Sequence, residues 1–165
     1  MLVYRASRRP RDAFDPLDSF ASVARDGWRF NDKRCPILYT AEVQSLAILE
    51  VVSRPGWQTV QELTIAAVAI PDGSVLDLDD LNLTLPTNWN MRPVGPNAQS
   101  IGREFLAAVD RAAADGQQVC GLRVPSVIST TDYNVLLDPR QVNQYSIADW
   151  VRLPFNWLVE TPTSH

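Results

Sequence analysis

The sequence contains one histidine, and it is the last residue, His165. A chain end is usually frayed, so this side chain is unsuited to catalysis, and sites of the Ser-His-Asp or Cys-His kind are excluded. The two cysteines, Cys35 and Cys120, lie far apart and outside any Cys-x-x-Cys spacing. We therefore predict no metal site and no disulfide framework, and expect two buried thiols in a reducing compartment.

Long apolar runs and an excess of positive charge are also absent. No run of 18 apolar residues occurs, and the first five residues lack the apolar core of a signal peptide. We therefore expect a cytoplasmic protein with no membrane association. The 15 Lys and Arg against 19 Asp and Glu give a formal charge of -4, so direct binding of nucleic acid is not expected, and any bound anion requires a local cluster of arginines.

The remaining composition is that of an ordinary folded protein. The chain has 165 residues, 45% of them apolar and 21% charged. These values predict one domain spanning residues 1–165, with a core large enough to fold without a metal ion or a disulfide.

Apolar patterning and turn residues predict the secondary structure. We expect strands at 2–6, 37–40, 63–70, 75–78, 119–124, 134–137 and 147–155, and helices at about 41–53 and 99–115. Thr40 is placed to cap the first helix, Pro55 and Gly56 to stop it, and Gly116 to end the second helix. Segments 22–32 and 85–97 read as irregular structure, the latter as a structured loop. The expected strands outnumber the helices and do not alternate with them as in a βαβ array. This order predicts an α+β fold, with mixed or antiparallel sheets and helices packed on them.

Glu50 is the most informative single residue, because it ends an apolar stripe formed by Val43, Leu46 and Ala47 on the first predicted helix. A buried carboxylate needs a cationic or hydrogen-bonding partner, unless it lies at the wall of a cleft. The alternative is an exposed pair with Arg54, four residues later, which stabilises a helix by only a few tenths of a kcal/mol. Periodicity does not decide between these interpretations.

Four further side chains have both a structural and a functional interpretation. Arg5 lies within an apolar strand and Arg29 between two aromatic residues; a guanidinium suits a pyrophosphate, although either could form a structural ion pair. Tyr39 could be a core aromatic or a stacking surface. Ser126 follows a strand and Pro125, and on its own would be read as a turn residue.

Taken in order, these segments resemble the RES domain family, the toxin half of a bacterial toxin–antitoxin system. Segment 27–31 (GWRFN) is similar to the family's GGRWN, and 38–50 (LYTAEVQSLAILE) to its YTAES-SLALLE pattern. The other matching segments are VYRA at 3–6, IP at 70–71, LPTNW at 85–89, QSIG at 99–102, VPS at 124–126 and NVLLDP at 134–139. The resemblance spans nearly the whole chain.

The resemblance implies a fold like that of ADP-ribosyltransferase toxins and an enzyme that depletes NAD by hydrolysis or phosphorolysis of the nicotinamide–ribose bond, as an NAD⁺ glycohydrolase or phosphorylase. NAD is the substrate, and no cofactor is implied. Arg5 and Arg29 match the family's arginines and would hold the pyrophosphate. Tyr39 matches its tyrosine, against nicotinamide or its ribose.

Glu50 matches the family's glutamate, and Ser126 the serine that completes the pocket, with Asn134 as a further substrate-binding residue. Cleavage passes through an oxocarbenium-like state and nicotinamide leaves neutral, so one carboxylate can suffice without a general acid. We expect Glu50 to stabilise the ribosyl cation and to orient water or phosphate, with Arg29 and Tyr39 as the other candidate catalytic residues.

Four positions depart from the family's pattern: Trp28 replaces a glycine, Arg103 an aspartate and Asp138 an asparagine, and Trp157 lies in an altered C-terminal motif. None of them removes a site residue.

The resemblance also implies a partner, an Xre-like antitoxin that blocks the cleft. The loop around Trp89 and the aromatic C-terminal segment are candidate contact surfaces. Two alternative functions stay open: transfer of ADP-ribose onto a protein acceptor, and a binding domain that holds NAD without turnover.

Overall fold

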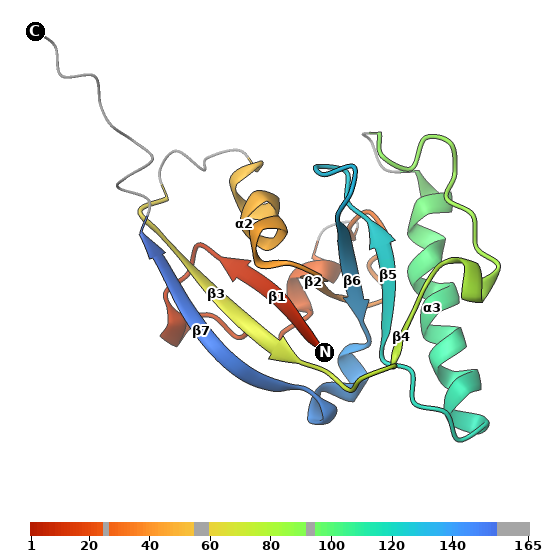
Figure 1. Cartoon of the computed structure of the whole chain (residues 1–165). Helices are drawn as coiled ribbons and strands as arrows, with labels where there is room; N and C mark the ends of the chain where they lie inside the picture. The colour runs from red at the N-terminus through yellow and green to blue at the C-terminus, as the bar shows by residue number, and fades with distance from the viewer. Residues whose placement is uncertain (25–26, 55–59, 92–94, 155–165) are drawn as a thin grey trace, which may run out of the picture.

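The structure is a computed structural model that describes residues 1–24, 27–54, 60–91 and 95–154. Within these ranges the chain is an α+β protein built on one mixed seven-stranded sheet, as the patterning predicts (Figure 1). The strands are β1 (Leu2–Ser7), β2 (Leu38–Ala41), β3 (Glu62–Ala69), β4 (Val75–Leu76), β5 (Gly121–Pro125), β6 (Tyr133–Leu137) and β7 (Ser146–Pro154). The α-helices are α1 (Phe20–Val23), α2 (Gln44–Val52) and α3 (Pro96–Ala114), with short 3-10 turns η1 (Arg11–Ala13), η3 (Asp79–Leu81) and η4 (Pro139–Gln144).

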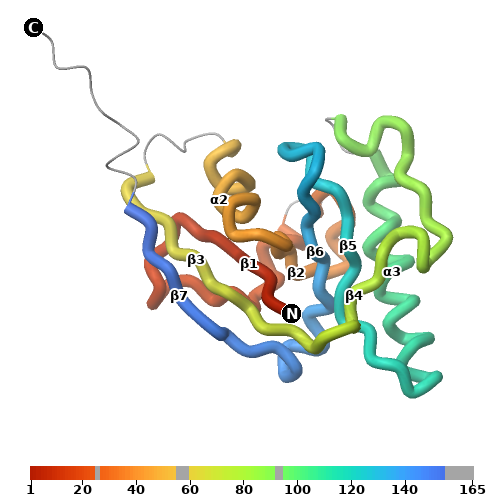
Figure 2. The backbone as a smooth tube through the Cα atoms, viewed as in Figure 1, coloured from red at the N-terminus to blue at the C-terminus, as the bar shows by residue number. Residues whose placement is uncertain are grey.

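The sheet has the order β4-β5-β6-β2-β1-β3-β7, with β4–β5 parallel and the other neighbours antiparallel. β1 and β2 share one paired position, Tyr4 with Ala41, and the two halves of the sheet run in different directions on either side of it (Figure 2). Strands far apart in sequence therefore meet at the centre of the sheet.

The two long helices, α2 and α3, lie on one face of this sheet. Leu46 and Ala47 of α2 pack against Tyr4 and Ala6 of β1, and Phe105 of α3 is buried against β5 and β6. A second cluster, around Val3 and residues of β3 and β6, fills the opposite face. Burial of these apolar side chains from both faces is the main stabilising contribution to the fold.

The first long helix begins later than the sequence predicts. Thr40 and Ala41 belong to β2, where the Thr40 hydroxyl donates a hydrogen bond to the carbonyl of Val135, 2.7 Å away. The prediction that Thr40 caps the helix was therefore wrong: Val43 occupies the N-cap position, without a side-chain bond. Pairing with β6 satisfies the Thr40 side chain instead, and the predicted stop at Pro55 and Gly56 lies outside the described residues.

Local differences also occur around α3 and in two loops. α3 starts at Pro96, inside the predicted loop, because Gly95 caps it and proline is favoured in a first helical turn. The predicted end is confirmed, with Gly116 at φ 70° just beyond the C-cap Asp115. The segment 22–32, expected to be irregular, begins within the last two residues of the short helix α1.

None of the described helices is long and apolar enough to cross a membrane.

Candidate active site

Three of the candidate residues, Glu50, Ser126 and Asn134, meet in one cluster, which we call the carboxylate cluster. Oε1 of Glu50 accepts a hydrogen bond from the Asn134 side-chain amide at 2.9 Å and a second from the Ser126 hydroxyl at 3.3 Å. The donors come from residues 76 and 84 positions away in the sequence. Glu50 is half-buried on α2, so its side chain reaches solvent while its carboxylate is oriented by two donors.

The sheet explains why these residues meet. Asn134 is paired with Val124 of β5 and with Ala41 of β2, so it lies on the face that α2 covers. Ser126 comes directly after β5 and is only 5% exposed. Its oxygen also accepts bonds from the backbone amides of Ile128 and Ser129, at 3.1 and 3.4 Å. Ser126 is therefore both a turn residue and a donor to Glu50, and its hydroxyl is fixed by the turn.

A tight turn next to this cluster carries Arg29. The backbone amide of Trp28 donates to the carbonyl of Asn31 at 2.9 Å, and Gly27 adopts φ 86°. A side chain at Gly27 would collide with the Asn31 carbonyl, so glycine is required both by the conformation and by the space. The sequence GWRFN thus builds a rigid turn at 28–31, in a segment where the sequence predicts irregular structure.

Asn31 fixes this turn from inside. It is fully buried, and its side-chain amide donates to the carbonyls of Ser22 and Cys35 at 2.9 and 2.8 Å. Its Oδ1 accepts a 2.8 Å hydrogen bond from the Tyr39 hydroxyl, which itself accepts from the amide of Phe30 at 3.0 Å. The Tyr39 hydroxyl is therefore already satisfied, and it is the ring that remains to contact a ligand.

Electrostatics also keep the Tyr39 phenol neutral. Burial raises the pKa of Tyr39 well above its ordinary value, and the negative charge of Glu50 raises this pKa further. The hydrogen bond from Phe30 and the positive charge of Arg29 lower the pKa of Tyr39, but they do not outweigh burial. Tyr39 pairs with Leu136 of β6, two residues from Asn134 on the same face of the sheet, and its hydroxyl is bound by the amide of Phe30, which follows Arg29, so the turn and the carboxylate cluster lie on either side of Tyr39.

Arg29 links the turn to the loop after η3. Its Nη1 donates to the carbonyls of Trp89 and Met91, at 2.6 and 3.2 Å. The ring of Trp89 stacks on Phe30, with centroids 6.0 Å apart and an interplanar angle of 20°. Trp89 is half-buried by this packing, which gives it a structural role beside the predicted contact surface.

Trp28 lies where the matching family pattern has glycine, and its indole joins the site. Its ring centroid is 5.5 Å from that of Tyr39, and the guanidinium carbon of Arg54 is 4.1 Å from its ring centroid. The indole Nε1 donates to the carbonyl of Ala21 at 2.7 Å. Arg54, two residues beyond the end of α2, therefore stacks on Trp28.

Arg5 is placed differently from the other candidates. Tyr4 and Ala6 face α2, so strand alternation puts Arg5 on the opposite face with Val3. Its Nη1 donates to the carbonyls of Pro16 and Asp18, at 2.8 and 2.7 Å. Burial lowers the pKa of Arg5, against the opposing charges of nearby aspartates. Among the described contacts, those of Arg5 tie down the segment after η1, and none joins it to Glu50.

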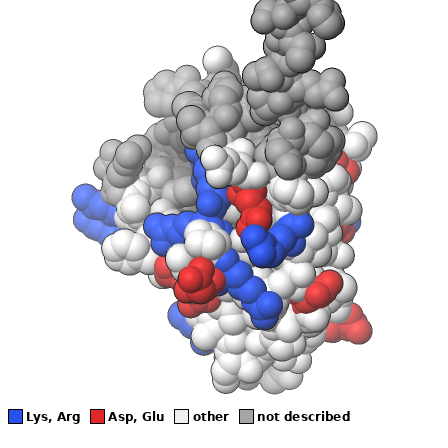
Figure 3. Space-filling view, turned by 90° about the vertical axis from the view of Figure 1, so that its left-hand side faces the viewer, with Lys and Arg blue, Asp and Glu red and all other residues white. Residues whose placement is uncertain are grey.

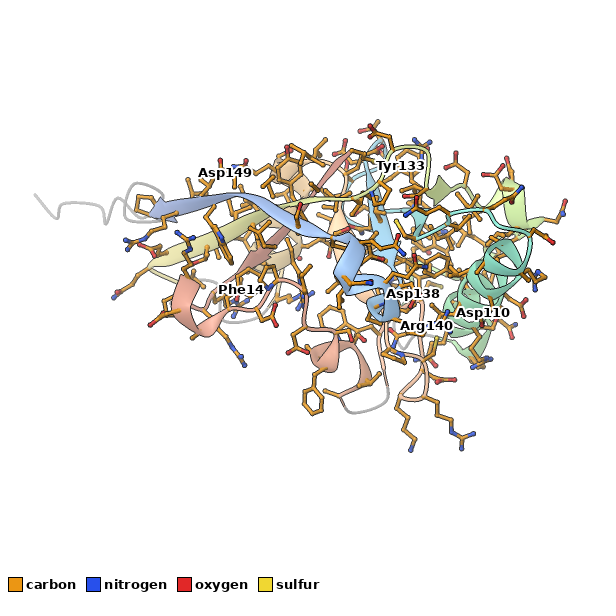
Figure 4. All side chains as sticks on the ribbon, turned by 90° about the horizontal axis from the view of Figure 1, so that it is seen from below. Phe14, Asp110, Tyr133, Asp138, Arg140 and Asp149 are labelled. Carbon is orange, nitrogen blue, oxygen red and sulfur yellow. The ribbon has the colours of Figure 1, made fainter. Side chains whose placement is uncertain are left out.

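Two of the departures from the family pattern have structural partners. Arg103 of α3 forms an ion pair with Asp32, at the end of the turn. Asp138 is 1% exposed and accepts hydrogen bonds from the amide and Nε of Arg140, both at 2.9 Å. Arg140 also pairs with Asp110 of α3 at 2.9 Å, and Figure 4 shows the three labelled side chains together at that end of α3. The departure at Trp157 lies outside the described residues.

The sequence did not indicate that Asn31 and Gly102 hold the 28–31 turn in place. The Gly102 amide donates to the Phe30 carbonyl at 2.8 Å, and a Cβ there would clash with that oxygen. The Gln99 side chain holds the Trp28 carbonyl at 3.1 Å. The first turns of α3 therefore hold the 28–31 turn through hydrogen bonds to two of its carbonyls. The signal was present in the matching segments GWRFN and QSIG, but the pairing between them is a long-range contact that no local pattern specifies.

A hollow of about 610 Å³ lies elsewhere, on the side of the molecule shown in Figure 3, where basic and acidic side chains alternate. It is lined by residues of η1, β3 and β7, namely Pro10, Arg11, Asp12, Glu62, Trp150 and Arg152. Arg152 forms a bidentate ion pair with Glu62, in which Nε and Nη2 donate to the two carboxylate oxygens at 3.0 and 2.7 Å. Arg11 stacks on Trp150. None of the candidate residues predicted from the sequence lines this hollow.

The carboxylate cluster can stabilise a developing positive charge. It offers an oriented acid group, with the ring of Tyr39 on the same sheet face and Arg29 on the neighbouring turn for an anionic part of a ligand. Among the described ranges, no group of three or more His, Cys, Asp or Glu side chains could hold a metal ion.

Comparison with known proteins identifies relatives over most of the chain. The family model of the RES domain matches residues 2–157. A protein named Toxin Res from Yersinia enterocolitica is 32% identical over 115 residues, 69% of this chain and 69% of that protein. Another Toxin Res, from Photorhabdus laumondii, is 30% identical over 116 residues, 68% of this chain and 67% of that protein. The family match includes the carboxylate cluster, the 28–31 turn and Arg5.

Proposed function

This chain belongs to the RES domain family, and we propose that it is the toxin of a bacterial toxin–antitoxin pair that depletes NAD by cleaving the nicotinamide–ribose bond. The observation that carries the proposal is the carboxylate of the half-buried Glu50, oriented by Ser126 and Asn134. The names of the two relatives support a toxin, and we expect it to act in the cytoplasm on the cellular NAD pool.

Glu50 is the catalytic group in this proposal. The bond between C1 of the ribose and the pyridinium nitrogen breaks, its electron pair stays on the nitrogen, and nicotinamide leaves neutral. Positive charge then develops on the ribose, where a carboxylate stabilises it. Water or phosphate forms the new bond to C1, giving ADP-ribose or its 1-phosphate, and water's proton passes to Glu50 or to solvent.

Ser126 and Asn134 act as positioning residues for Glu50. Both donate to Oε1, which fixes the carboxylate rotamer before substrate arrives and leaves Oε2 for the reacting sugar. Such preorganisation is the usual source of electrostatic catalysis.

The arginines and Tyr39 supply substrate binding. We propose that Arg29, whose charge acts on Tyr39, attracts the diphosphate, and that the Tyr39 ring lies against nicotinamide or its ribose. The proposed diphosphate role of Arg5 requires its guanidinium to be reached from the other sheet face, at the place where β1 and β2 diverge.

Product analysis tests the proposal. Purified protein is incubated with NAD⁺, with and without phosphate, and nicotinamide, ADP-ribose and ADP-ribose 1-phosphate are separated by chromatography. We expect stoichiometric nicotinamide release; dependence on phosphate selects phosphorolysis over hydrolysis. Label from adenine-labelled NAD⁺ retained on macromolecules would instead show ADP-ribosyl transfer, and binding without nicotinamide release would show a non-catalytic domain.

The partner is tested separately in cells. We propose a cognate antitoxin, Xre-like and encoded with the toxin, that closes the site. Expression of this chain alone should lower cellular NAD and stop growth, and coexpression of the cognate antitoxin should restore both. Growth arrest with unchanged NAD would contradict the proposed activity.

A further inference from the structure

The indole of Trp28 is an aromatic surface that already holds a flat cation. The guanidinium carbon of Arg54 lies 4.1 Å from the ring centroid, within the range of a cation–π contact. The Nε1 bond to the Ala21 carbonyl holds the indole, and the Gln99 bond to the Trp28 carbonyl holds the backbone of the same residue. The ring is therefore oriented by the protein rather than by the arginine alone.

This surface lies beside the carboxylate cluster. Trp28 packs against Tyr39, with ring centroids 5.5 Å apart, and Tyr39 lies on the same sheet face as Asn134, which donates to Glu50. Arg54 lies two residues beyond the end of α2, the helix that carries Glu50, so its contact with Trp28 places the indole face near the C-terminal end of that helix.

A planar cation of another kind is part of the proposed substrate. The nicotinamide ring of NAD⁺ is a pyridinium, flat and positively charged, whereas the dihydronicotinamide of NADH is neutral and puckered. We propose that Trp28 is a specificity-determining residue: its indole face takes the pyridinium ring in place of the Arg54 guanidinium, and so selects oxidised over reduced dinucleotide. This inference rests on the proposed function.

The charge change during cleavage decides which kinetic constant responds. The pyridinium loses its positive charge as the bond breaks, so the indole holds the substrate more strongly than the transition state or the released nicotinamide. Loss of the indole should therefore raise KM while leaving kcat unchanged or slightly higher, the pattern of a lost ground-state contact.

Binding measurements separate this role from others. Trp28→Leu removes the aromatic face, and Trp28→Phe is the matched control, because both lose the Nε1 bond to Ala21 and only one keeps a ring. Each is combined with Glu50→Gln to prevent turnover and titrated calorimetrically with NAD⁺, NADH and ADP-ribose. We expect Trp28→Leu to weaken NAD⁺ about tenfold, which corresponds to ~1.4 kcal/mol, and NADH and ADP-ribose less than twofold. Trp28→Phe should weaken NAD⁺ only two- to threefold.

Three outcomes would overturn the inference. Equal weakening of all three ligands would show stacking with adenine or damage to the turn, unchanged NAD⁺ affinity in Trp28→Leu would show that the indole makes no contact, and tighter NAD⁺ binding would show that Trp28 obstructs the site. Nicotinamide release by the protein with Trp28 and Glu50 intact is measured in parallel. Its absence refutes the proposed function, whereas its presence together with any of the three outcomes refutes only the role of Trp28.

Discussion

Removal of the Asn134 amide tests how the carboxylate of Glu50 is positioned. In Asn134→Ala, Oε1 of Glu50 loses its 2.9 Å donor and keeps only the 3.3 Å bond from Ser126. A hydrogen bond to a charged group contributes ~1.5–3 kcal/mol when buried. Because Glu50 is half-buried, we take the lower end, about 1.5 kcal/mol.

That loss predicts the kinetic outcome. About 1.4 kcal/mol corresponds to a tenfold change in rate, so kcat should fall roughly tenfold in Asn134→Ala. KM should change less than about threefold, because the amide acts through Glu50 rather than on the diphosphate. Ser126→Ala, which removes the longer bond, should lower kcat less.

The assay is initial-rate nicotinamide release at several NAD⁺ concentrations, with circular dichroism to confirm the fold of each variant. Asn134→Asp adds a severe test, because it preserves shape but places a second carboxylate against Glu50. We expect its kcat to fall further than that of Asn134→Ala. Full kcat in both variants, or a change confined to KM, would refute the positioning role of Asn134.

Three other predictions concern the frame of the site. Asp138→Ala removes the buried partner of Arg140, and we expect ~2 kcal/mol of lost stability, which lowers Tm by about 4–8 °C in differential scanning fluorimetry; an unchanged Tm would contradict the buried pairing. Gly102→Ala forces α3 away from the 28–31 turn and should lower both Tm and NAD⁺ affinity, whereas Gly95→Ala, where a Cβ meets no atom within 4 Å, changes only the N-cap of α3 and should lower Tm less and leave NAD⁺ affinity unchanged; equal loss of NAD⁺ affinity would show that the close approach does not matter. The raised pKa of Tyr39 means that the unfolded state loses its phenolic proton first, so stability should fall as pH rises above about 10, and less steeply in Tyr39→Phe; identical alkaline unfolding curves would contradict the buried neutral phenol.

The sequence was informative where one local pattern determines the outcome. The apolar run at 63–70 predicted β3. The stripe ending at Glu50 allowed either a carboxylate with partners or an exposed pair with Arg54, and the structure supplies partners in Asn134 and Ser126. The end of α3 at Gly116 followed from the same kind of local rule, because glycine readily adopts a positive φ.

The hydrogen-bond partners of Glu50 and Thr40 depend on pairing between strands far apart in the sequence, which no local pattern specifies. The donors to Glu50 come from beyond the end of β5 and from β6, so their identity depends on sheet register rather than on helical spacing. The wrong prediction of Thr40 as a helix cap has the same origin, because the Thr40 hydroxyl donates to the carbonyl of Val135 in β6. The resemblance supplied Ser126 and a motif containing Asn134, but not their contacts.

Arg5 illustrates a further limit. A strand pattern does not say which neighbouring residues lie against a helix until the helix is placed, and α2 lies on the face of Tyr4. The contacts of Arg5 with the carbonyls of Pro16 and Asp18 could not be read from sequence, and they give the residue a structural role besides the predicted one.

The most direct test of the account is the rate of nicotinamide release in Glu50→Gln, compared with the unaltered protein at saturating NAD⁺. The amide preserves shape and removes the negative charge that stabilises the ribosyl cation. We predict that kcat falls by about 10²–10³-fold, with the fold and NAD⁺ binding retained. Release of nicotinamide at an undiminished rate would show that the carboxylate held by Ser126 and Asn134 is not the catalytic group.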